Sequence, residues 1–321
     1  MKVFTFIIIS VAILVAVSTV FFIRNKNTIS NQRVSSNKTI QKTDKDRVLI
    51  AVGDIGDCNS EYDDKVAELV EDIPGTIALL GDTVYKDGTW EEFMNCFDPM
   101  WGKFKSRIKP AVGNHEYHTD GAWPYYQYFG KSAGKPQNGY YSYNLGKWHI
   151  VVLNSQLCLE DPDCQHSEQV EWLKKDLELH KNFCTLAYRH HPRFSSGPSS
   201  NDHLELPFWE ILYNTGADIS LTGHDHMYER FPLLNPIGQI DNEHGIRSFV
   251  VGTGGGESLH NYGRPSRNSE IKNNTTYGVL VLTLREKTYS WEFRPIKGQS
   301  FTDKGEGVCH GEPPEEKKVT L

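Results

Sequence analysis

The sequence predicts an α/β fold built on mixed β-sheets. Between Arg47 and His226, short apolar runs typical of buried strands alternate with amphipathic stretches typical of helices. Beyond His226, strand-like runs follow one another directly, which indicates that the sheets are mixed. Residues 47–297 contain no Pro/Gly/Ser-rich linker, no change of composition and no repeat of fixed period, so we expect them to form one domain.

The first half of this domain is expected to hold five strands and one helix. The run RVLIAVGD is continuously apolar before a Gly-Asp turn, and TIALLGD repeats that pattern. A helix is predicted over 62–72, because Val66, Leu69 and Val70 recur at helical spacing. The predicted strands are 47–54, 76–82, 108–116, 140–146 and 147–155.

The second half is expected to continue the alternation and to end in strands. Residues 167–180 have an amphipathic helical pattern with Ser167 as the N-cap, and a second helix is predicted over 206–214. The predicted strands are 184–192, 217–226, 245–253, 276–284 and 288–296. From Gly298 the chain is polar, and we expect a loose tail over 298–321 apart from Cys309.

The N-terminal residues are expected to form a membrane-targeting segment, either a transmembrane anchor or a signal peptide. Val3 to Ile23 is an uncharged apolar run that reaches the ~20 residues a membrane-spanning helix needs. It exceeds the ~7–15 residues of a signal-peptide core, which favours a retained anchor over 1–24, although Ala16-Val17-Ser18 would also serve as a cleavage site. Lys and Arg are more frequent after the run than before it, which by itself would place the body in the cytoplasm. Residues 25–46 are polar and are expected to form a flexible tether.

Cysteine usage favours export. The chain has 6 cysteines and no CxxC pair of the zinc-site type. Cys158 and Cys164 bracket a short loop that a disulfide closes easily; among the fifteen connectivities we expect this pair and Cys58–Cys96, which leaves Cys184 with Cys309. Reduced thiols in a cytosolic protein are the alternative. Behind an apolar leader we expect an exported body, either membrane-anchored or secreted after cleavage.

The composition limits the functional classes. Apolar residues make up 38 % and charged residues 23 % of the chain, which excludes a disordered protein. Lys and Arg number 34 against 41 Asp and Glu, a formal net charge of −7. A protein that binds nucleic acid through a basic face is therefore not expected.

Polar side chains follow several of the predicted strands at tight turns. Each turn places Gly or Pro beside the polar residue, which lets the backbone bend sharply. Strand carboxyl ends are where open α/β sheets place ligand sites. Carboxylate, amide, imidazole and phenol groups without thiolate suit Fe, Zn or Mn, and paired metals typically serve in-line displacement at phosphorus. The turns are GDIG (53–56), GDTVY (81–85), GNHE (113–116), RHHP (189–192) and GHDH (223–226).

Taken in this order from Val52 to His226, these blocks resemble the signature of the calcineurin-like metallophosphoesterases. Tyr85 in GDTVY resembles the purple acid phosphatase branch, whose tyrosinate favours a ferric ion. The runs YYSYNLGKWHIVVLNS and HHPRFSSG are similar to compact bacterial members. The resemblance implies a four-layer αββα sandwich of two mixed sheets flanked by helices.

The resemblance also implies roles for the motif residues. One metal, Fe(III), would be held by Asp54, Asp82, Tyr85 and His226. The second, a divalent Fe, Zn or Mn, would be held by Asp82, Asn114, His190 and His224, so that Asp82 bridges the two.

His190 is chosen over His191 because the family's ligand is followed by x-Pro, and His191 is expected to face the substrate. His115 resembles the family's phosphate-contacting and leaving-group-protonating histidine, with Glu116 orienting it; a purely supporting role for His115 is the alternative. Candidates for the edge of the pocket are His118, Asp225 and Arg230. The aromatic run Tyr125, Tyr126, Tyr128 and Phe129 is expected to pack in the core rather than to form a substrate wall.

These features predict an exported, metal-dependent phosphatase of phosphomonoesters that uses a metal-bound hydroxide as nucleophile. A phosphodiesterase or nucleotidase with the same site is the alternative. A tethered binding or adhesion protein that keeps the fold without activity predicts a broken ligand position, and none is broken. The glycine-rich GTGGGE (252–257) lacks the following helix of a dinucleotide site, and we expect a tight loop near the metals.

Overall fold

The computed structural model describes residues 46–161, 163–180, 184–199 and 203–310. The predicted membrane segment and tether lie outside the described residues, as does the end of the C-terminal tail. Among the helices that are described, none combines the length and the apolar character needed to cross a membrane.

Two β-sheets form the centre of the body. The first has six strands in the order β13-β12-β11-β1-β2-β3, and β1, β2 and β3 run parallel while the others pair antiparallel. Its strands are β1 (Arg47–Val52), β2 (Thr76–Leu80), β3 (Ile108–Ala111), β11 (Gly278–Leu284), β12 (Thr288–Pro295) and β13 (Lys304–Val308). The predicted mixed character of the sheet is confirmed.

The second sheet has seven strands in the order β10-β8-β9-β7-β6-β5-β4. Its middle strands β5, β6, β7 and β9 are parallel, and antiparallel strands close both edges. The strands are β4 (Tyr141–Leu145), β5 (Trp148–Val152), β6 (Cys184–Tyr188), β7 (Ile219–Thr222), β8 (Tyr228–Leu234), β9 (Ile246–Val251) and β10 (Ile271–Asn273).

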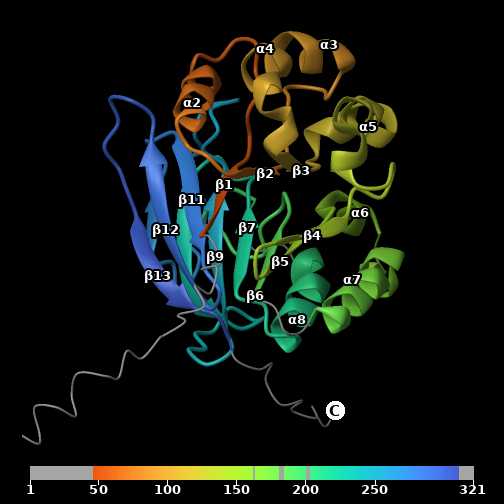
Figure 1. The fold of residues 1–321 in the computed structure, drawn as a ribbon, viewed down its shortest axis with the longest axis vertical. Helices are drawn as coiled ribbons and strands as arrows, with labels where there is room; N and C mark the ends of the chain where they lie inside the picture. Colours follow the sequence, from red (N-terminus) through yellow and green to blue (C-terminus); the bar gives the residue numbers. More distant parts are fainter. Residues whose placement is uncertain (1–45, 162, 181–183, 200–202, 311–321) are drawn as a thin grey trace, which may run out of the picture. The chain divides into compact units, whose positions relative to one another are not determined.

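Helices pack on the outer faces of both sheets (Figure 1). The first sheet carries α2 (Tyr62–Glu71), α3 (Trp90–Glu92), α4 (Asp98–Trp101) and α5 (Trp123–Phe129), with the predicted aromatic run of α5 packed in that core. The second carries α7 (Glu168–Leu179) and α8 (Leu206–Asn214), and α6 (Ser155–Glu160) follows β5. Ser167 caps α7 by accepting a hydrogen bond from Val170 N, as predicted.

Side-chain alternation along the strands explains the four layers. Leu49 and Ala51 of β1 pack between the sheets, whereas Ile50 and Val52 pack beneath the helices. In β5, Ile150 faces the other sheet and neighbouring Val151 faces α7 and α8. Strands buried on both faces have near-continuous apolar sequences, and this is why the apolar runs of the sequence correctly predict these strands. The expected αββα sandwich is confirmed.

The expectation of a loose tail from Gly298 is wrong for residues 304–308. This segment forms β13, which pairs antiparallel with β12 along the edge of the first sheet. A Cβ atom at Gly305 would lie 2.4 Å from the ring of Trp291, so a small residue is needed where the strand crosses this ring. The segment KGEGV therefore lacks the apolar alternation by which strands are predicted.

All three expected disulfides are present. Cys58 joins Cys96, and Cys158 joins Cys164 across the short loop. Cys184, the first residue of β6, joins Cys309, which follows β13, so this bond connects the two sheets across 125 residues of sequence.

Removing the bond between the sheets is expected to destabilise the protein more than removing the local one. Loop-closure entropy predicts that the Cys184→Ala/Cys309→Ala variant loses about 5 kcal/mol of unfolding free energy and Cys158→Ala/Cys164→Ala about 2 kcal/mol. Urea denaturation of both variants and the wild type measures the difference. Equal losses would contradict a stabilisation that depends on loop length.

Candidate dimetal centre

The predicted polar turns meet where parallel strands of both sheets end. Asp54 follows β1, Asp82 follows β2 and Asn114 follows β3 in the first sheet. His190 follows β6 and His224 follows β7 in the second sheet. The carboxyl ends of these strands therefore lie at the same end of the sandwich, and the side chains that follow them converge there.

One group of donor atoms surrounds the hydroxyl of Tyr85. The Tyr85 hydroxyl oxygen lies 3.1 Å from Asp54 Oδ1 and 3.3 Å from Asp82 Oδ2. It also lies 3.1 Å from Nε2 of His226. The Tyr85 hydroxyl thus contacts the other three residues predicted to share the first metal.

A second group surrounds Nε2 of His190. This nitrogen lies 3.0 Å from Asn114 Oδ1, 3.0 Å from Asp82 Oδ2 and 3.1 Å from His224 Nδ1. The same Asp82 oxygen therefore belongs to both groups. The structure brings the predicted residues together in two clusters that share one carboxylate.

The turns that carry these side chains are sterically demanding. Asp54, Asp82 and His224 have φ values of 64°, 47° and 68°, in the left-handed region that residues with a side chain rarely adopt. A Cβ atom at Gly113 would lie 2.2 Å from Oδ1 of Asp82, which explains the glycine in GNHE. Backbone strain of this kind is typical of functional sites.

Backbone carbonyls fix the direction of the imidazole rings. His190 Nδ1 lies 2.8 Å from the carbonyl of Leu80, and His226 Nδ1 lies 3.2 Å from that of Ser258. A carbonyl oxygen only accepts hydrogen bonds, so both Nδ1 atoms carry the proton and both Nε2 atoms face the clusters. This arrangement is typical of metal-binding histidines.

The electrostatics of the clusters favour a bound cation. Burial raises the pKa of the Tyr85 phenol well above its ordinary value, and the carboxylates of Asp54 and Asp82 raise it further. Burial alone would raise the pKa of Asp82, but the His190 imidazole and its neighbours hold it below its ordinary value. Burial lowers the pKa of His190, yet the Asp82 carboxylate outweighs this and raises it to about 9. In the absence of a cation, the phenol proton and the His190 imidazolium offset the negative charge of the buried carboxylates. A bound metal cation could offset the same charge in their place.

His115 lies beside the clusters rather than within them. Its backbone N–H donates to Asp82 Oδ1 at 3.0 Å, and its ring packs 4.5 Å from the ring of Tyr85. Nδ1 donates to the carbonyl of Lys86 at 2.6 Å, so Nε2 faces the centre and lies 3.9 Å from Asp82 Oδ2. The side chain remains 21 % exposed.

His191 lies next to the second cluster. Its ring centroid is 4.3 Å from that of His224, and Ser155 Oγ lies 2.8 Å from its Nδ1. Burial, followed by the charges of His190 and His224, lowers its pKa well below the ordinary value. A neutral imidazole thus stands beside the second group.

Glu116 has a different environment from the one expected. Its buried carboxylate accepts hydrogen bonds from the backbone N–H groups of Asp82, Thr83 and Gly113 at 3.2, 2.6 and 2.7 Å. It therefore joins the turns after β2 and β3, and the carbonyl of Lys86 orients His115 instead. The sequence did not show this, because the partners are main-chain atoms.

The three expected pocket-edge residues differ in their surroundings. Asp225 is buried, accepts hydrogen bonds from Ser195 Oγ and from Ser199 N, and lies 3.9 Å from His260 Nδ1. Arg230 pairs with Asp303 at 2.7 Å, beside β13. His118 does lie close to the site, since its Nδ1 is 3.0 Å from the Lys86 carbonyl.

The glycine-rich segment 252–257 forms the expected tight loop near the clusters. Gly254 N donates to the carbonyl of Gly53 at 3.0 Å, and Gly256 N donates to that of Asp54 at 2.8 Å. These contacts hold the loop against the first turn, GDIG.

Curated relatives of the chain include plant purple acid phosphatases. Purple acid phosphatase 15 of Arabidopsis thaliana is 28 % identical over 254 residues, covering 64 % of this chain and 44 % of that protein. Purple acid phosphatase 23 of the same plant is 25 % identical over 232 residues, covering 59 % of this chain and 50 % of that protein. The chain thus matches half or less of the length of these relatives.

Solved structures show the same fold. A purple acid phosphatase from seeds of yellow lupin (Lupinus luteus) superposes with a TM-score of 0.68 at 19 % identity, covering 84 % of this chain and 55 % of that one. An anchor protein of the inner membrane complex of Plasmodium superposes with a TM-score of 0.64 at 14 % identity, covering 83 % and 90 %.

The family model of the calcineurin-like phosphoesterases matches residues 47–228, which contain β1 to β7 and every turn of the two clusters. This match spans more than half of the chain. With purple acid phosphatases among its homologues and its structural neighbours, the chain belongs to the calcineurin-like phosphoesterase family.

Proposed function

We propose that this chain is a dimetal phosphatase that hydrolyses phosphomonoesters. The observation that carries the proposal is the single Asp82 oxygen that lies in contact with both donor clusters. Asp54, Tyr85 and His226 would complete one metal site, and Asn114, His190 and His224 the other. The mixture of oxygen and nitrogen donors without thiolate fits Fe(III) beside a divalent Fe, Zn or Mn.

When bound, the two metals supply the positive charge that activates water and stabilises the phosphoryl oxygens. The protein's own part is to hold this site rigid and to move a proton. His115 is suited to the second task, because the Lys86 carbonyl fixes its Nδ1 proton, its Nε2 faces the centre and its side chain is partly exposed. We assign His115 the role of protonating the leaving oxygen, and His191 the role of facing the substrate.

Export is part of the proposal. Three disulfides lie among the described residues, and such bonds persist in oxidising compartments. The apolar run of residues 3–23 would deliver the body there, by anchoring or by cleavage.

Asp82→Ala is expected to abolish metal binding and activity together, because both sites lose a donor. Metal content is measured by mass spectrometry. Activity is measured as the rate of hydrolysis of a phosphomonoester and of a phosphodiester across pH. Asp98→Ala, which removes a half-buried carboxylate on α4 that binds the Tyr128 hydroxyl, is the control and should keep both metals. Full metal content in Asp82→Ala would contradict the bridging role.

His115→Ala is expected to keep both metals but to lose activity by about 10²–10⁴-fold, the usual contribution of general acid catalysis. The loss should be large for an alkyl phosphate and small for p-nitrophenyl phosphate, whose leaving group needs no proton. Steady-state kinetics on the two esters measure the contrast. Loss of metal from the variant would refute the assignment.

Tyr85→Phe is expected to lose the visible band of an iron–tyrosinate centre. The iron-loaded wild type should absorb in the visible range, and the variant should be bleached. The absorption spectrum, read with the metal content, makes the test. A colourless, metal-replete and active wild type would instead place Zn or Mn in the first site.

A further inference from the structure

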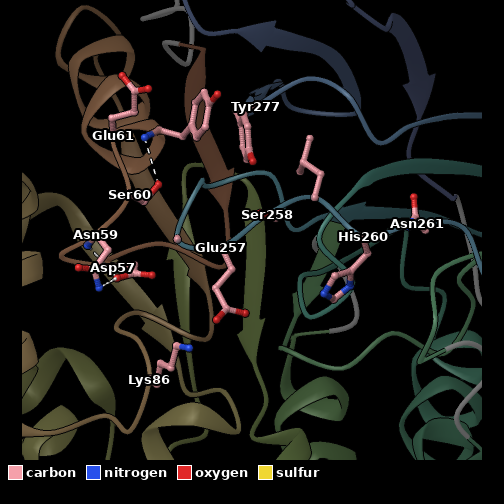
Figure 2. A pocket seen from close by; sticks show the side chains of 13 residues that line it. Asp57, Asn59, Ser60, Glu61, Lys86, Glu257, Ser258, His260, Asn261 and Tyr277 are labelled. Carbon is pink, nitrogen blue, oxygen red and sulfur yellow. Dashed lines mark hydrogen bonds between the residues drawn. The ribbon is translucent and has the colours of Figure 1, made fainter.

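A cavity of about 790 Å³ lies beside the candidate centre, and its side chains take no part in the proposed hydrolysis (Figure 2). We call it the side pocket. It is lined by Asp57, residues 59–62, Lys86, residues 256–261 and Tyr277.

The side pocket adjoins the residues of the first cluster. His260 stacks on His226 with ring centroids 4.0 Å apart, and the Ser258 carbonyl accepts from His226 Nδ1. Lys86 follows Tyr85 in the chain, and its carbonyl holds His115. An alcohol that is protonated by His115 would therefore leave along the wall that Lys86 and 256–261 form.

The charge of the lining is predominantly negative. Asp57, Glu61 and Glu257 contribute carboxylates, and Lys86 contributes an ammonium group. Glu61 is already paired with Lys65 at 2.7 Å. In Figure 2, Glu257 and Asp57 extend from different loops into the part of the pocket nearest to Lys86. An anionic leaving group would be repelled here, and a cationic one attracted.

Aromatic rings complete the lining. Tyr62 and Tyr277 stack with centroids 4.2 Å apart. Lys65 Nζ lies 5.2 Å from the centroid of the Tyr62 ring, so this aromatic surface already attracts an ammonium group. The lining thus contains both carboxylates and aromatic rings, two kinds of group that attract an ammonium ligand.

We propose that the side pocket binds the alcohol part of the substrate and selects phosphomonoesters whose alcohol carries an ammonium group. The proposal rests on the phosphatase function above. Hydrolysis breaks the bond between phosphorus and the alcohol oxygen, water supplies the new oxygen on phosphorus, and the alcohol takes its proton from His115. Asp57 and Glu257 act in it as specificity residues.

The test compares matched two-carbon substrates. O-phosphoethanolamine and 2-phosphoglycolate differ in the charge at the end of the alcohol, and phenyl phosphate is the neutral reference. In Glu257→Gln and in Asp57→Asn, the ratio of kcat/KM for phosphoethanolamine to that for phosphoglycolate should fall at least about fivefold, the effect of one nearby charge in water. Glu178→Gln, an exposed carboxylate on α7 outside the pocket lining, should leave the ratio unchanged.

Binding provides a second readout that does not depend on turnover. Calorimetry with 3-aminopropylphosphonate and 3-phosphonopropionate should show that the same two substitutions weaken binding of the first ligand and strengthen binding of the second. If phenyl phosphate is hydrolysed and neither the ratio nor the binding changes, the side pocket has no such selectivity and the phosphatase function stands. If the metal-loaded wild type hydrolyses none of the esters, the proposed function itself is overturned, and the inference with it.

Discussion

The structure depends on a buried carboxylate, that of Asp82, held at the junction of two sheets. Oδ1 accepts from the backbone of His115, and Oδ2 contacts the Tyr85 hydroxyl and His190. A buried charge is tolerated only with such partners. The left-handed turn at Asp82 and the clamp by Glu116 both serve to hold this group in place. Strain and polar burial, which cost stability, are thus concentrated where the chemistry is proposed.

Much of this site could be predicted from the sequence because its signals are local. Each of the turns GDIG, GDTVY and GNHE follows an apolar strand directly, so the polar residue must emerge at the edge of a sheet. Helix 206–214 and the N-cap Ser167 were likewise predictable from short patterns, and both are confirmed. The disulfide pairs were confirmed as well.

The remaining features depend on contacts that have no side-chain signature in the sequence. The carbonyls of Leu80, Ser258 and Lys86 orient three histidines, yet any residue type supplies a carbonyl. Strand β8 was missed because Pro232 and the register shift between Arg230 and Leu233 interrupt its pattern. Glu116 was given the wrong partner for the same reason, since it binds backbone from two distant turns.

The bond between Cys184 and Cys309 has a mechanical consequence. Cys184 begins β6, and His190 lies just beyond the other end of the same strand, about 20 Å away at the usual rise per residue. The two sheets are thus joined by a disulfide at one end and by the contact between Asp82 and His190 at the other. Two connections so far apart oppose sliding of one sheet across the other. The distances between site residues that belong to different sheets are therefore constrained at both ends of the sandwich.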